Sequence, residues 1–191
     1  MSPENFDDLD SSMEELRIFE DAYSVKHIIQ ESRYSKAITA YISNLQELRY
    51  YQDKLNLQEG NVTRPCLKRE FIDAMMRSKD GEYNYELMAK GRPPVTAFYG
   101  EDSLELHHIR QEYKGPFAEL TPTQHRHADA GVVLHPLGDK QESWRSDKEK
   151  CDAFNKERAR YWKKRSKEID GQQYLLPLER SQLRRRGHKL I

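Results

Sequence analysis

Histidine is the residue type whose distribution along this chain most needs an explanation. Five of the seven histidines fall within residues 107–135, and two of them, His107 and His108, are adjacent. Neutral imidazole is a preferred ligand of zinc and other transition metals, and histidine is also the side chain best suited to take a proton from water near neutral pH. Adjacent histidines at the end of a strand can divide these two tasks. The pattern therefore predicts a metal site, and a catalytic one.

The residues around this histidine pair predict a small antiparallel frame. Residues 104–109 alternate between apolar and polar side chains, which predicts a strand with Leu104 and Leu106 on one face. Residues 117–120 predict a returning strand, and residues 95–99 a further short strand. The pair is thus expected on a hairpin.

A helix is expected directly after the hairpin. Thr121 is a typical helix cap, Pro122 suits the first helical position, and Gln124 is the capping-box partner of Thr121. This helix carries His125 and is expected to stop before Gly131, so that a second imidazole approaches the pair.

A longer helix is predicted over residues 146–169, with Ser146 as its cap. Phe154, Tyr161 and Trp162 are expected to pack inward. The other side is basic and is expected to contact phosphates without reading sequence. Its five residues are Lys156, Arg160, Lys163, Lys164 and Lys167.

The first part of the chain predicts helices without a catalytic cluster. Residues 11–31 are expected to form one helix, and residues 34–55 a single amphipathic helix of coiled-coil type. A third helix is expected over residues 65–78, with Leu67 and Phe71 inward. We interpret this region as a support, delivery or partner-binding module.

Composition narrows the classes of protein that remain. Hydrophobic residues make up 36% and charged residues 34% of the 191, and the mean hydropathy is −1.00. No apolar run approaches the roughly 20 residues of a membrane helix, and the acidic N-terminus lacks the order of a signal peptide. The two cysteines are too far apart for a zinc knuckle. Net charge is zero, yet residues 1–35 are acidic and residues 156–191 are basic.

An ordered set of short motifs resembles a known family. LELHHI, Gln111, GPFAELT, HR and LHP follow one another over residues 95–168, together with aromatic and basic residues near the end. This order is similar to that of the LHH nucleases of the HNH/endonuclease VII superfamily, which have a ββα-metal fold and are commonly the toxic tips of bacterial polymorphic toxins. The resemblance leaves the first 90 residues unexplained.

The resemblance also implies roles for individual residues. His107, His125 and His135 would hold one divalent metal ion, and His108 would be the general base. The residue four positions after His125 is Asp129, which remains an alternative to His135 as a ligand. Arg126 is the candidate for stabilising charge on the phosphate, with Arg110 a second local candidate. Three imidazoles favour Zn²⁺ or Ni²⁺, whereas a ligand oxygen from Asp129 would favour Mg²⁺ or Mn²⁺.

Taken together, we expect an α+β protein with three parts. These are a helical region over residues 1–90, a ββα-metal nuclease domain over 91–170 and a basic tail over 171–191. The expected activity is that of a largely non-specific, metal-dependent endonuclease, on DNA more than RNA, serving as an antibacterial toxin with a cognate immunity protein. It would act in the cytoplasm, in its own cell or in a target cell after dedicated secretion. A sequence-specific HNH endonuclease and a non-enzymatic, metal-stabilised interaction module remain alternatives.

Overall fold

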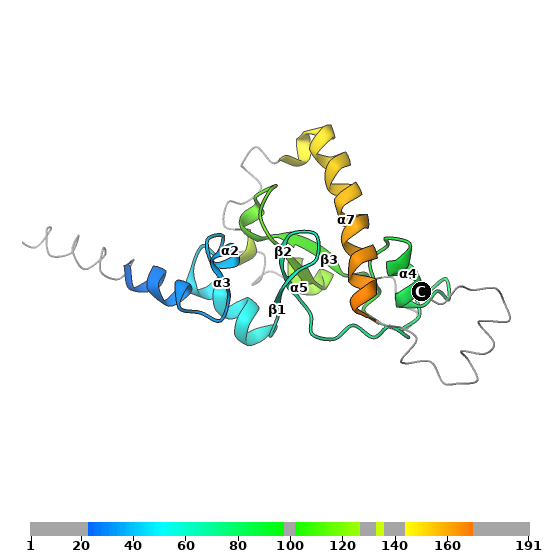
Figure 1. The fold of residues 1–191 in the computed structure, drawn as a ribbon, viewed down its shortest axis with the longest axis horizontal. Coiled ribbons are helices and arrows are strands. Elements are labelled where there is room, and N and C mark those ends of the chain that lie inside the picture. Colours follow the sequence, from blue (N-terminus) through cyan, green and yellow to red (C-terminus); the bar gives the residue numbers. More distant parts are fainter. Residues whose placement is uncertain (1–22, 98–101, 127–132, 136–143, 170–191) are drawn as a thin grey trace, which may run out of the picture.

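Helices and strands are mixed in the fold, which confirms the α+β prediction (Figure 1). The computed structural model describes residues 23–97, 102–126, 133–135 and 144–169. The expected helix over 11–31 is described only from residue 23, and residues 23–30 are helical. Within the described part of the chain, no helix is both long and apolar enough to cross a membrane.

A four-stranded sheet forms the centre of the described structure, in the order β1-β2-β4-β3. The first two strands, β1 (Gln58–Asn61) and β2 (Pro65–Lys68), are antiparallel, and β2 runs parallel to β4 (Phe117–Leu120). The hairpin partner of β4 is β3 (Glu105–His108). The predicted hairpin is therefore present. Of the strand expected over 95–99, the described residues contain only a single bridge between positions 95 and 103.

The prediction of a helix over residues 65–78 is wrong. Residues 65–68 form β2, in which Cys66 and Leu67 are buried on opposite sides of the sheet. Phe71, expected inward, is 62% exposed. As a strand, this segment pairs with β4, which lies far along the chain. This pairing buries more apolar surface than a local helix would. The next helix, α4 (Asn84–Ala89), was not predicted.

The prediction of a single helix over residues 34–55 is also wrong. The structure has α2 (Lys36–Thr39), α3 (Leu45–Arg49) and a π-helical turn, Tyr50–Lys54. A new helix begins because the side chain of Asn44 accepts the backbone N–H of Glu47 as a cap. The apolar face was nevertheless identified correctly, since the side chains expected on it all belong to or pack against one core. They are Tyr34, Ile38, Tyr41, Leu45, Leu48 and Leu55.

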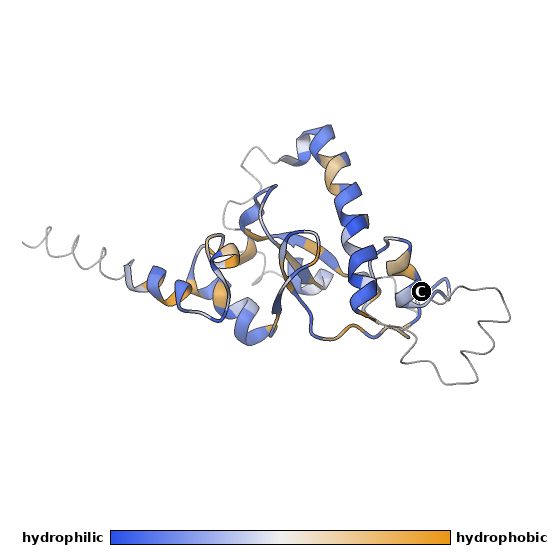
Figure 2. Ribbon diagram, viewed as in Figure 1, coloured by the Kyte–Doolittle hydropathy of each residue, from blue (hydrophilic) through white to orange (hydrophobic). Residues whose placement is uncertain are grey.

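The sheet separates two hydrophobic cores. Successive side chains of a strand point to opposite faces, so Phe117 joins the core beneath the C-terminal helix while Ala118 joins the core beneath α2 and α3. Figure 1 shows the sheet between these helical regions, and in Figure 2 the C-terminal helix is hydrophilic over most of its length. The sheet is thus covered on both sides.

The C-terminal helix, α7 (Lys148–Glu168), matches its prediction apart from its cap. Asp147 rather than Ser146 accepts the backbone N–H of Lys150. Tyr161 and Trp162 are fully buried and Phe154 is partly buried, as expected. The helix is fixed by a buried ion pair, in which Arg165 donates to Glu119 over 2.9 Å.

Candidate metal centre

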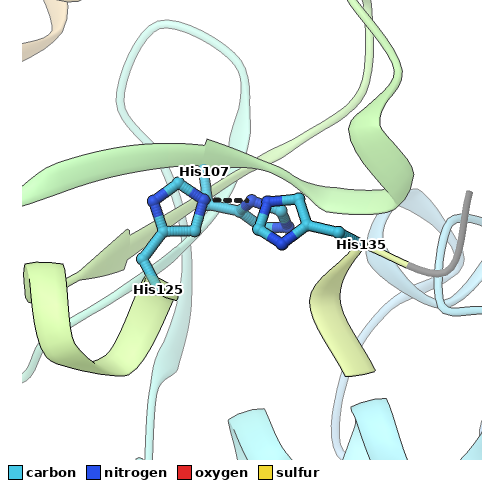
Figure 3. Close-up of side chains that lie close together, drawn as sticks. All are labelled: His107, His125 and His135. Atoms are coloured by element: carbon cyan, nitrogen blue, oxygen red, sulfur yellow. Dashed lines mark hydrogen bonds between the residues drawn. The ribbon is translucent and has the colours of Figure 1, made fainter. Parts of the chain in front are cut away.

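Three imidazoles from separate elements converge in the structure. His107 lies on β3, His125 on α5 (Pro122–Arg126), and His135 follows a short helical segment at residues 133–134. One ring nitrogen of each lies within 4.8 Å of the others (Figure 3). We call this group the three-histidine site. Its members are the three ligands expected from the sequence.

The spacing and chemistry of the three-histidine site fit a transition metal. Nδ1 of His107 is 3.0 Å from Nε2 of His125, and two imidazole ligands on one tetrahedral metal ion would be about 3.3 Å apart. Nε2 of His107 is buried and has no hydrogen-bond partner among the described residues. Buried polar atoms in proteins are normally satisfied, so this ring has unused hydrogen-bonding capacity on Nε2, while its other nitrogen, Nδ1, faces His125.

A carboxylate orients one of the three rings. Nδ1 of His125 is 2.6 Å from Oε2 of Glu105, whose other oxygen pairs with Arg126. A carboxylate accepts hydrogen bonds, so Nδ1 carries the proton and Nε2 presents its lone pair toward His107. Glu105 was not predicted from the sequence. The available signal was its position two residues before His107 on the same strand, since such residues share a face.

Burial keeps the rings in the form that binds metals. Desolvation holds the pKa of His107 well below its ordinary value, and it lowers the pKa of His125 to about 4. Both rings are therefore neutral near pH 7. Metal ligation requires this neutral form of histidine, so the site needs no proton release from these two rings at that pH.

His108 does not join the three-histidine site. It follows His107 on β3 and points to the other face of the sheet, where its ring contacts Phe117, Trp144 and Phe154 at centroid distances of 4.7 to 4.9 Å. Nε2 is buried without a hydrogen-bond partner among the described residues. Burial lowers the pKa of His108 to about 3, so the ring is a neutral acceptor.

The helix that carries His125 is built as predicted. The hydroxyl of Thr121 accepts the backbone N–H of Gln124, and the Gln124 side chain accepts the backbone N–H of Thr121. Arg126 ends this helix and is exposed apart from its pairing with the carboxylate. The alternative ligand, Asp129, lies outside the described residues.

The basic residues predicted to bind nucleic acid lie on the exposed side of α7. All five are exposed, and one of them also donates to the protein, through Nζ of Lys164 to the carbonyl of Val62 over 3.1 Å. None belongs to the three-histidine site. The predicted basic tail over 171–191 lies outside the described residues.

A comparison with known protein families finds a match over the part of the chain that carries the three-histidine site. The model of one family, described as a nuclease of this superfamily with conserved LHH, matches residues 83–168. The matched stretch contains the LHH of this chain, which is Leu106 with the two histidines that follow. No solved structure matches the chain.

Proposed function

We propose that this chain is a metal-dependent endonuclease that hydrolyses phosphodiester bonds with little sequence specificity, in DNA more than in RNA. The observation that carries the proposal is the three-histidine site, located inside a domain of a nuclease family. A bound divalent cation would stabilise the negative charge that develops on the phosphate. His107, His125 and His135 would hold it, and three nitrogen ligands favour Zn²⁺ or Ni²⁺.

His108 is our candidate for the general base. The ring is neutral near pH 7, and its Nε2 has no partner among the described residues, so this nitrogen can accept a proton once the burial that weakens its basicity is relieved. The role requires that water reaches this nitrogen in the substrate complex, because Trp144 and Phe154 now pack against the ring. Arg126, at the exposed end of α5, would add positive charge beside the phosphate.

The exposed basic side of α7 would contribute affinity without sequence readout. Lysine and arginine contacts to phosphates are independent of base identity and weaken with salt. This property suits a toxin that damages any chromosome it meets, and we propose an antibacterial effector whose producer makes an immunity protein. An acidic surface on that inhibitor would complement this side of the helix.

Incubation of the purified chain with plasmid DNA and with RNA, across a panel of divalent cations and with a chelator as control, tests the activity. We expect a smear of DNA fragments that disappears with the chelator. Discrete fragments would instead indicate a sequence-specific endonuclease. No cleavage with any cation would contradict the proposal and favour a metal-stabilised interaction module.

The variant His108→Ala tests the general base separately. We expect hydrolysis to be lost while metal content and fold persist, because the ring lies outside the three-histidine site. The variant His107→Ala is the matched comparison, since it should lose both hydrolysis and metal. Undiminished cleavage by His108→Ala would refute the assignment of the base.

A further inference from the structure

A groove of about 550 Å³ opens directly beside the three-histidine site. It is lined by residues of β3, α5 and the N-terminal half of α7, and its wall includes His125. Ligand sites in proteins have volumes of roughly 300–1,000 Å³, so the groove has room for part of a nucleic-acid strand. A strand in this groove would touch the edge of the metal centre.

Positive charge predominates along the groove. Its charged lining residues are three arginines and two acidic residues. They are Arg126, Arg145 and Arg158, and Asp102 and Glu105. Glu105 already pairs with Arg126 and with the neighbouring imidazole of α5. Arg145 and Arg158 bring two further guanidinium groups to the groove, against the carboxylate of Asp102.

Arg158 is held in a position suited to an anion. Its guanidinium lies 5.8 Å from the centre of the Phe154 ring, within the range of a cation–π contact. The described carboxylates form no ion pair with it. Guanidinium groups bind phosphate through two parallel hydrogen bonds, a geometry that lysine cannot reproduce.

We propose that Arg158 and Arg145 bind the sugar–phosphate backbone of the substrate strand in this groove and position it against the three-histidine site. This inference rests on the proposed nuclease function and assigns binding residues that the sequence did not indicate. It also distinguishes two sides of α7. Arg160 is two residues further, about 200° around the helix, and does not line the groove.

Arg158 and Arg160, on different sides of α7, provide a matched experiment. Fluorescence anisotropy with a short labelled DNA duplex, in the presence of a chelator, measures binding without hydrolysis for the full chain and for R158Q, R145Q and R160Q. The same titrations across a range of salt concentrations give the dependence of affinity on salt. Arg49, exposed on α3 away from the groove, supplies the control variant R49Q.

We expect R158Q and R145Q each to weaken DNA binding about tenfold, as for a lost hydrogen bond to a charged group. Each should also reduce the slope of log affinity against log salt by about 0.9, the effect of one lost phosphate contact. R158K should keep that slope, because it keeps the charge. We expect at most about a threefold loss for R160Q, as for an exposed charge, and no change for R49Q.

An affinity and salt slope of R158Q and R145Q equal to those of R49Q would overturn the proposal, as would a larger loss for R160Q. Circular dichroism checks the fold of each variant, and R145Q and R158K decide the matter if R158Q is misfolded. The plasmid assay on the unaltered chain reports hydrolysis separately. Cleavage with no effect of the groove arginines refutes the groove alone, whereas groove-dependent binding without cleavage refutes the enzymatic function.

Discussion

The carboxylate of Glu105 lies 2.6 Å from Nδ1 of His125, a residue on a different element. Glu105 also precedes His107 by two positions on β3, so one face of one strand supplies both a ring of the three-histidine site and the group that orients a second ring. Such outer carboxylates fix the tautomer and raise the basicity of a ligating imidazole. The strand is therefore central to the proposed metal centre.

Replacing Glu105 with Gln should weaken metal binding about 10- to 100-fold, the usual effect of losing such a partner. The amide keeps the size of the side chain but removes the negative charge. Isothermal titration with Zn²⁺ measures the affinity. The variant Glu112→Gln removes an exposed carboxylate that pairs with Arg110, and it should bind the metal normally. Equal affinities for the two variants would show that Glu105 has no such role.

The third ligand can be identified by comparing two single variants. His135→Ala should lose the metal, because this ring lies within the three-histidine site, whereas Asp129→Ala should retain it. Metal content by mass spectrometry and the rise in Tm on adding Zn²⁺ both report binding, since a ligand that binds only the folded state raises stability. Loss of metal in Asp129→Ala alone would reverse the assignment.

Loss of the ion pair between Arg165 and Glu119 should lower the free energy of unfolding by a large amount. Both side chains are buried, and Glu119 also accepts a hydrogen bond from the hydroxyl of Tyr161. Arg165→Met would leave a buried carboxylate without its cation, which costs about 3–5 kcal/mol. Urea denaturation measures the free energy of unfolding. The exposed variant Lys163→Met is the control and should change stability by under about 0.5 kcal/mol; similar values for the two variants would contradict the prediction.

Glu47 predicts that stability falls as pH rises. Its side chain is fully buried, accepts the backbone N–H of Ser43 over 2.7 Å, and has a pKa raised by burial from 4.5 to about 7. The folded state therefore keeps a proton that the unfolded chain releases, and stability declines between about pH 4.5 and pH 7. The decline amounts to about 3 kcal/mol.

The variant Glu47→Gln should remove this part of the pH dependence, because an amide imitates the protonated acid. Urea denaturation at a series of pH values compares it with the unaltered chain. Glu70→Gln, at an exposed position, controls for the loss of one negative charge. A Glu47→Gln profile parallel to that of the unaltered chain would rule out Glu47 as the source.

Local signals allowed part of this fold to be predicted. The alternation over residues 104–109 and the reciprocal bonds of Thr121 and Gln124 depend only on neighbours in sequence, and both features are present. The strand Pro65–Lys68 depends on pairing with β4, more than 40 residues away, and was mistaken for a helix. Apolar spacing identified buried positions correctly but did not reveal where a capped helix begins.

The same distinction applies to the candidate site. The clustering of histidines indicated a metal site, and the resemblance to the LHH family named the three histidines that the structure brings together. It did not identify Glu105, because a carboxylate that orients a ring has no motif of its own. The sequence pattern also did not draw out that the rings of His107 and His108 lie on opposite faces of β3, which follows from the period of a strand. Arg158 was not assigned to substrate binding, because the predicted phosphate-binding face of α7 was the one that carries Arg160.

The parallel pairing of β2 with β4 bears on how this domain can be excised. A fragment limited to the family match, residues 83–168, would lack both β1 and β2. The backbone groups of β4 would then form an open edge, and the side chains of Cys66 and Leu67 would no longer fill the space beside it. Open edges template association with other chains. A soluble recombinant fragment should therefore begin before Gln58.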